Sequence, residues 1–188
     1  MYYIITENFY TNNSSINLDD RSEYYSDLDS PKLSIKNKLK AFELESEKYS
    51  EDFHWVGEII ASDKITKIIV NHNPFNIICL PLILDGKESY SMLSINHTLS
   101  CLDNKKSIIT ENSYFPGKYV IKELYIDFEK LKSYEKHLTR MFVIKEAHNY
   151  IVVNKDLGEE LLEYIENNPR TSLRIIPIAE NGQVPKVL

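Results

Sequence analysis

Glycine is scarce in this chain, with five residues among 188. The five lie far apart, so the sequence contains neither a glycine-rich phosphate-binding loop nor a dinucleotide-binding fingerprint. The G-x-S-x-G elbow that carries the nucleophile of many hydrolases is missing as well. These absences exclude the enzyme classes that depend on such loops. The glycines are Gly57, Gly86, Gly117, Gly158 and Gly182.

Cysteines and long apolar runs are also few. Cys79 and Cys101 are the only cysteines, too few for a scaffold built on disulfides. The longest apolar run, residues 77–84, is far shorter than the roughly 20 residues of a membrane-spanning helix. Residues 1–7 contain no basic segment followed by an apolar one, so no signal peptide is predicted. We therefore expect a cytoplasmic protein with reduced thiols and no membrane partner.

The formal net charge is −6, and the acidic excess is confined to the first third of the chain. Residues 1–60 contain twelve acidic and six basic side chains, whereas residues 61–188 contain sixteen of each. No basic stripe is present, so nucleic acid is not a predicted partner. An acidic region attracts a basic protein at long range. The alternative interpretation is a solvated acidic face that only keeps the protein soluble.

Short β-branched and apolar runs predict more strands than helices. The run at 75–84, the turn at 85–87 and the return at 90–95 predict a β-hairpin. Residues 98–103 are predicted to form a short helix or turn. The clearest helix is predicted for residues 156–166, with Asn154 as its cap; its apolar face consists of Leu157, Leu161, Leu162 and Ile165. The predicted fold class is α+β, with a mainly antiparallel sheet, a few short helices and one clear C-terminal helix.

A single domain is predicted for residues 1–179, since the length suits one domain. Hydrophobic residues make up 43% of the chain and charged residues 27%, proportions that are typical of a globular protein and exclude disorder as its main state. Within this domain, residues 7–50 are predicted to be acidic and partly loop. Residues 180–188, which include Gly182 and Pro185, are predicted to form a flexible tail.

Two local pairs could carry chemistry. His97 and Cys101 are four residues apart and would share a face if that stretch were helical. His54 and Glu58 would lie on one side of a strand and could form an acid/base pair. His97 and Cys101 lack the two further ligands that a metal site needs, and a catalytic Cys/His pair usually comes from distant elements. No nucleophile or oxyanion donor is identifiable near His54 and Glu58. We therefore predict no catalytic, metal or cofactor residues; the alternative is a small enzyme, a hydrolase or one that reverses a modification, that uses these residues with Asp103.

A tyrosine-bearing acidic loop is the predicted partner-binding segment. Tyrosine supplies a large contact area at low entropic cost, and mixed aromatic and acidic side chains suit protein recognition. The alternative is a polar loop without a partner. The candidate residues are Asp19, Asp20, Glu23, Tyr24, Tyr25, Asp27 and Asp29.

From about residue 51 onward, an ordered series of short segments resembles a known family. The most family-like segment is Leu99-Ser-Cys-Leu-Asp103, followed by Ser107. The others lie at residues 60–65, 80–88, 90–96, 124–127, 140–145 and 151–157. Together they resemble immunity protein family 11 of the bacterial polymorphic toxin systems. The resemblance covers residues 1–5 and 51–178, whereas residues 7–50 match no segment of that family and form its variable part here.

The resemblance implies an intracellular antidote in competition between bacteria. Such a protein binds a cognate toxin domain and blocks it as a stoichiometric inhibitor, without catalytic residues of its own. The acidic excess of the chain adds the expectation that the toxin domain is basic. A third interpretation is an oligomeric interaction protein with no toxin partner. The sequence leaves open both the toxin's activity and the oligomeric state.

Overall fold

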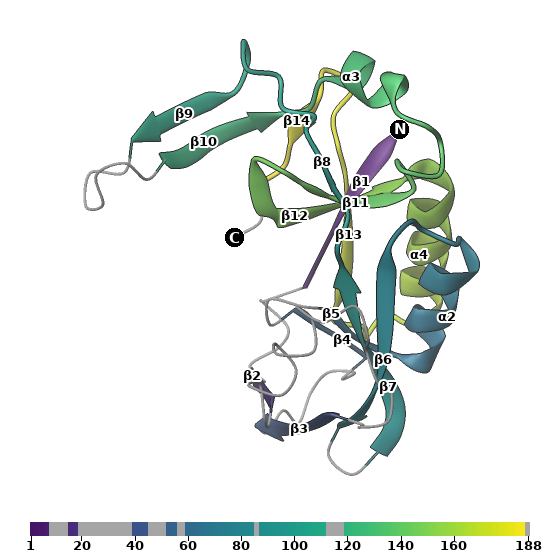
Figure 1. Cartoon of the computed structure of the whole chain (residues 1–188). Coiled ribbons are helices and arrows are strands. Elements are labelled where there is room, and N and C mark those ends of the chain that lie inside the picture. The colour runs from purple at the N-terminus through teal and green to yellow at the C-terminus, as the bar shows by residue number, and fades with distance from the viewer. Residues whose placement is uncertain are drawn as a thin grey trace.

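The computed structural model describes residues 1–7, 15–18, 39–44, 52–55, 59–84, 87–111 and 119–186. Strands and helices follow one another along the chain as Figure 1 shows. In chain order they are β1 (Tyr2–Glu7), β2 (Ser15–Leu18), β3 (Leu39–Leu44), β4 (Phe53–Trp55), β5 (Ile59–Ser62), α2 (Asp63–Asn71), β6 (Ile77–Leu84), β7 (Lys87–Ile95), β8 (Thr98–Leu99), β9 (Ile108–Glu111), β10 (Tyr119–Tyr125), α3 (Phe128–Ser133), β11 (Met141–Ile144), β12 (Ala147–Asn154), α4 (Lys155–Asn167), β13 (Leu173–Pro177) and β14 (Gln183–Val184).

The described strands form three sheets. The orders are β13-β1-β12-β11-β8, β14-β10-β9 and β2-β3-β6-β7-β5-β4. Pairing is antiparallel except between β3 and β6 and between β8 and β11. Helices α2 and α4 pack against each other beside the two larger sheets (Figure 1). The predicted α+β class is therefore confirmed, as is the predicted hairpin, which joins β6 to β7.

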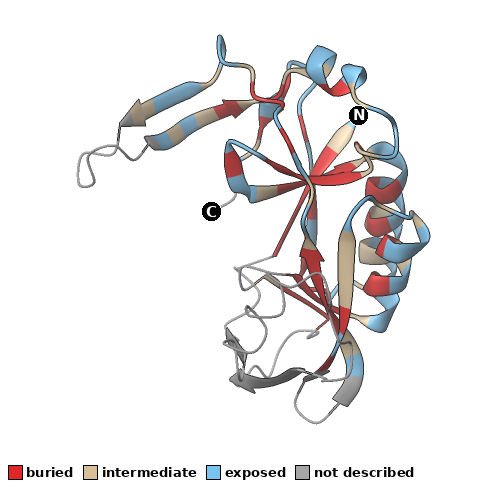
Figure 2. Cartoon of the chain, in the orientation of Figure 1, coloured by how far each residue is buried: buried red, intermediate tan, exposed pale blue. Residues whose placement is uncertain are grey.

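Strand β1 divides the hydrophobic core into two parts. Tyr3 and Ile5 belong to one buried cluster, which includes residues of α2 and α4, whereas Ile4 belongs to a second one with Leu131 of α3. This alternation follows from the two-residue period of a strand. Because both faces of β1 are covered, the strand is buried along almost its whole length, as Figure 2 shows. The N-terminal strand is thus a central element of the fold.

Helix α4 confirms the predicted C-terminal helix and its cap. The side chain of Asn154 accepts a hydrogen bond from the backbone N–H of Leu157 at 3.2 Å, which satisfies one of the free donors of the first turn. Leu157 and Leu161 are fully buried, and Leu162 and Ile165 pack against the same cluster. Pro169 follows the last turn, and a proline cannot continue a helix.

Two local predictions are wrong. Residues 98–99 form a strand parallel to β11 rather than a helical turn, because the N–H groups of Val143 and Lys145 bond the carbonyls of His97 and Leu99. Residues 183–184, predicted to lie in a flexible tail, pair with β10. Gly182 makes this return possible, since its φ of +88° is accessible mainly to glycine and a Cβ there would lie 2.2 Å from the Ile126 carbonyl oxygen.

Candidate functional site

The tyrosine-bearing acidic loop lies outside the described residues. The segment remains a predicted docking site. All the residues predicted to bind the toxin belong to it, namely Asp19, Asp20, Glu23, Tyr24, Tyr25, Asp27 and Asp29.

His54 lies against a carboxylate that the local sequence does not indicate. Its Nδ1 atom is 3.4 Å from Oε1 of Glu7, at the end of β1. The other oxygen of Glu7 accepts a hydrogen bond from the backbone N–H of Trp55 at 3.0 Å. The predicted partner, Glu58, is outside the described residues. Since His54 is only 1% exposed and Glu7 only 7%, this pair lies within the interior, where it joins β1 to β4.

Asp52 organises a second buried polar network beside the first. Its carboxylate accepts hydrogen bonds from the Tyr164 hydroxyl at 2.7 Å, the Thr171 hydroxyl at 2.9 Å and the backbone N–H of Ser172 at 3.2 Å. Burial and the neighbouring Asp52 carboxylate raise the pKa of Tyr164, so its hydroxyl stays protonated as a donor. The network ties the chain before β4 to the end of α4 and the start of β13.

His97 and Cys101 do not share a helical face, because the chain between them is extended. Nε2 of His97 lies 3.0 Å from the Leu138 carbonyl oxygen, and its ring meets Phe75 edge to face, with 5.0 Å between centroids. Cys101 is fully buried in the second core cluster with Leu102 and Leu124. Burial raises the pKa of the Cys101 thiol to about 12, and the Glu146 charge adds to the shift. A thiol held in its protonated form is a poor nucleophile.

We expect thiol reagents to distinguish the two cysteines. In the native protein at pH 8, iodoacetamide should label the partly exposed Cys79 at least about tenfold faster than the buried Cys101, because only the accessible thiolate reacts. Peptide mass spectrometry over time measures both rates. Unfolding in urea is the control and should make the rates similar. Fast labelling of Cys101 in the native protein would contradict its burial and support the enzyme alternative.

Asp103 has a structural role in the turn before β9. Its Oδ1 atom accepts hydrogen bonds from the backbone N–H groups of Lys105 at 3.0 Å and Lys106 at 3.2 Å. Partial desolvation opposes the effect of these bonds, but together with the Lys106 charge they lower the pKa of Asp103. The carboxylate is thus held by its own turn, as in an Asx-turn.

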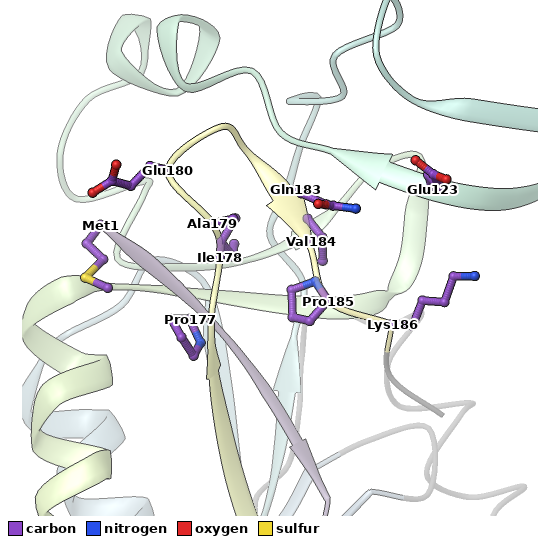
Figure 3. Close-up of a pocket in the computed structure, with 10 residues that line it drawn as sticks. All are labelled: Met1, Glu123, Pro177, Ile178, Ala179, Glu180, Gln183, Val184, Pro185 and Lys186. Carbon is purple, nitrogen blue, oxygen red and sulfur yellow. The ribbon is translucent and has the colours of Figure 1, made fainter.

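A pocket of about 640 Å³ lies where β13 leads into the turn before β14 (Figure 3). None of the predicted site residues lines it. Its polar side chains are few, and those of Glu180 and Lys186 point outward in the close-up. The lining residues are Met1, Glu123, Pro177, Ile178, Ala179, Glu180, Gln183, Val184, Pro185 and Lys186.

No family model and no curated protein matches this chain. Within the described ranges, no three His, Cys, Asp or Glu residues are grouped so that they could hold a metal ion. In the same ranges, no helix has both the length and the apolar character that crossing a membrane requires.

Exposed apolar side chains that the sequence did not indicate lie on β9 and β10, here called the arm. The arm extends away from the two larger sheets (Figure 1). Ile108 is 45% exposed, Ile109 43% and Val120 44%. The alternating pattern at 119–126 is typical of any strand with one buried face, so periodicity alone could not identify these side chains as exposed. Exposed aliphatic side chains that lie close together mark interaction surfaces.

Proposed function

We propose that this chain is an immunity protein that acts in the cytoplasm, where it binds and neutralises a cognate bacterial toxin domain as a stoichiometric inhibitor. The observation that carries the proposal is the confinement of the acidic excess to residues 1–60. The ordered segments that resemble immunity protein family 11 support a toxin domain as the partner. Electrostatic attraction then favours a basic toxin and a fast association.

Two of the acidic side chains in residues 1–60 are buried in the fold, so fewer negative charges are available to the partner. Glu7 and Asp52 are two of the twelve acidic residues of this region, and both are buried and bonded within the fold. Their charges stabilise the framework and offer little to a docking protein. The docking charge is therefore assigned to the remaining acidic residues, first of all Asp19, Asp20, Asp27 and Asp29. This assignment keeps the partner-binding segment apart from the buried framework.

The contacts of the candidate catalytic side chains favour inhibition over catalysis. His54 lies 3.4 Å from Glu7 inside the framework, burial raises the pKa of the Cys101 thiol, and Asp103 caps its own turn. A catalytic group must reach its substrate and must hold a suitable protonation state. The observed contacts serve the fold, which supports an inhibitor that acts by binding.

Neutralising the acidic loop should weaken toxin binding. We expect the fourfold variant Asp19→Asn, Asp20→Asn, Asp27→Asn and Asp29→Asn to associate at least about tenfold more slowly at low salt, because steering depends on charge. The native partner is first captured from its own cells on the tagged chain and identified by mass spectrometry. Surface plasmon resonance at 20 and 300 mM salt then measures the association rates of the variant and of the natural chain.

A second fourfold variant provides the matched control. Changing Glu129, Glu135, Glu159 and Glu166 to Gln removes the same charge from exposed positions of the neutral part of the chain. This variant should keep most of the association rate and its salt dependence. If the loop variant binds as fast as the natural chain at both salt concentrations, the loop is not the docking segment. If no basic partner is captured in a one-to-one complex, the proposed function itself is wrong.

A further inference from the structure

The arm ends in an open sheet edge. Among the described strands, β9 pairs only with β10, so it is the outer strand in the order β14-β10-β9. An edge strand presents unpaired backbone N–H and C=O groups that can bind another strand. Natural proteins protect such edges with charged side chains, proline or β-bulges. Residues 108–111 (Ile-Ile-Thr-Glu) contain neither lysine nor proline; the charged Glu111 ends the strand, and the register shift lies in β10, between Ile121 and Glu123. A two-stranded ribbon is marginally stable alone, so this edge gains from a further strand.

Aliphatic side chains are exposed on both faces of the arm, which determines how a partner must bind. Ile109 lies opposite Ile121 on one face, and Val120 lies opposite Thr110 on the other, next to Ile108. A partner that packed on one face would leave the other uncovered. A strand added to the β9 edge extends both faces at once, because side chains alternate between the faces. The geometry therefore favours edge addition.

We propose that β9 pairs in antiparallel orientation with β9 of a second copy of this chain. A two-fold axis perpendicular to the sheet would pass at Ile109 and join the two arms into one continuous sheet, in the order β14-β10-β9-β9-β10-β14. Such a contact is isologous and closes, since each copy uses its single open β9 edge once. The product is a symmetric dimer rather than a fibre.

The side chains of β9 select this register. A two-fold axis perpendicular to the sheet keeps each face of the sheet on its own side, so residues that lie opposite each other belong to the same face. Residues of one face are two positions apart in a strand. The axis therefore passes beside a residue that faces its own copy, and not between two consecutive residues. When the axis passes at Ile109, the Ile109 side chains of the two copies lie opposite each other. Together with Ile121 of each copy they form a row of four isoleucines across the joined sheet. On the other face the axis places Ile108 opposite Thr110, beside Val120. Aliphatic and β-branched cross-strand pairs of this kind stabilise a sheet.

The size of the contact predicts a weak dimer. Residues 108–111 are a short edge, so the buried area falls at the small end of protein–protein interfaces, below about 1,200 Å². We expect a dissociation constant in the range of about 10–500 μM, typical of transient association. The contact involves neither the acidic loop nor a toxin, so it is independent of the proposed function.

Sedimentation equilibrium of the full chain without any partner tests the proposal. The natural chain should pass from monomer to dimer between 1 μM and 1 mM, the range set by the expected affinity. Ile109→Lys and Ile109→Glu should each weaken association at least about tenfold, because like charges would face each other across the axis. An equimolar mixture of the two variants should associate again, since lysine then faces glutamate.

The mixture separates this register from a general hydrophobic contact. Val120→Lys is the matched control, because Val120 has the same exposure as Ile109 but lies one strand further from the axis; it should leave most of the association intact. A chain that stays monomeric up to 1 mM would overturn the proposal. The proposed register would be wrong if the mixture of the two Ile109 variants remained monomeric. It would also be wrong if Val120→Lys weakened association as much as Ile109→Lys does.

Hydrogen exchange provides a measurement that needs no variant. As the concentration of the natural chain rises through the dissociation constant, the edge-facing amides of residues 108–111 should exchange at least about threefold more slowly, because the added strand bonds them. Amides of α4 should be unchanged and serve as the internal reference. Equal exchange of residues 108–111 at all concentrations would contradict pairing at this edge.

Discussion

Asp52→Ala is expected to destabilise the fold by about 4 kcal/mol. The substitution removes a buried acceptor of four donors. The Ser172 hydroxyl can still donate to the Phe53 carbonyl, so up to three donors lose their partner, namely the hydroxyls of Tyr164 and Thr171 and the N–H of Ser172. Each buried donor left unsatisfied costs roughly 1–3 kcal/mol. The lower part of that range applies to the two hydroxyls, which can rotate. The result is large for one substitution because a single carboxylate joins elements 112 to 120 residues apart in sequence.

Urea denaturation at pH 7 measures this effect. Tyr164→Phe is the matched control, since it removes one donor but leaves the carboxylate bonded to Thr171 and Ser172; it should cost about 1 kcal/mol. Asp52→Asn keeps an acceptor oxygen and should fall between the two. If Asp52→Ala cost no more than Tyr164→Phe, the carboxylate would not be the centre of the network.

Gly158→Ala is expected to destabilise the protein by about 2 kcal/mol, although helix propensity alone predicts a gain of about 1 kcal/mol. Gly158 faces Tyr3 in the second turn of α4. A Cβ at this position would lie 2.3 Å from Cδ2 of Tyr3 and 2.9 Å from its Cγ. Rotation of the ring about its own axis does not move Cγ. Tyr3 is 5% exposed, so helix and strand must separate to admit the methyl group.

A pair of variants on the exposed side of α4 provides the control. Glu163 is exposed, so Glu163→Ala should be more stable than Glu163→Gly by about 1 kcal/mol, the ordinary difference in propensity. Tyr3→Leu should also reduce the cost of Gly158→Ala, because the two side chains share one contact. Thermal unfolding followed by circular dichroism measures these four variants and the double variant Tyr3→Leu, Gly158→Ala. A stabilising Gly158→Ala would show that β1 and α4 do not approach closely at this point.

Local sequence patterns were sufficient wherever a segment depends on its neighbours in the chain. The 3.6-residue period and the Asn154 cap predicted α4, and paired apolar runs around a turn predicted the β6–β7 hairpin. At residues 98–103 the same reasoning was wrong, since a distant strand, β11, supplies the N–H donors that hold this segment extended.

At the candidate sites, too, local sequence patterns missed the contacts between residues far apart in the chain. From His54 the sequence pointed to Glu58, four residues away, whereas the carboxylate in contact comes from Glu7. Spacing along one strand identifies side chains that share a face, but it carries no information on which other strand lies opposite. The pairing of Asp52 with Tyr164 and Thr171 was invisible for the same reason.

Composition and periodicity were enough to determine the α+β class, the C-terminal helix and the confinement of acidic charge to residues 1–60, because these properties add up along the chain. Which apolar strands are covered and which stay exposed was decided by tertiary packing. Strand β1 and strand β9 are both short and rich in β-branched residues, yet β1 is buried between two clusters, whereas β9 pairs on one side only among the described strands. Burial depends on the order of strands in a sheet, and that order follows from contacts between residues far apart in sequence.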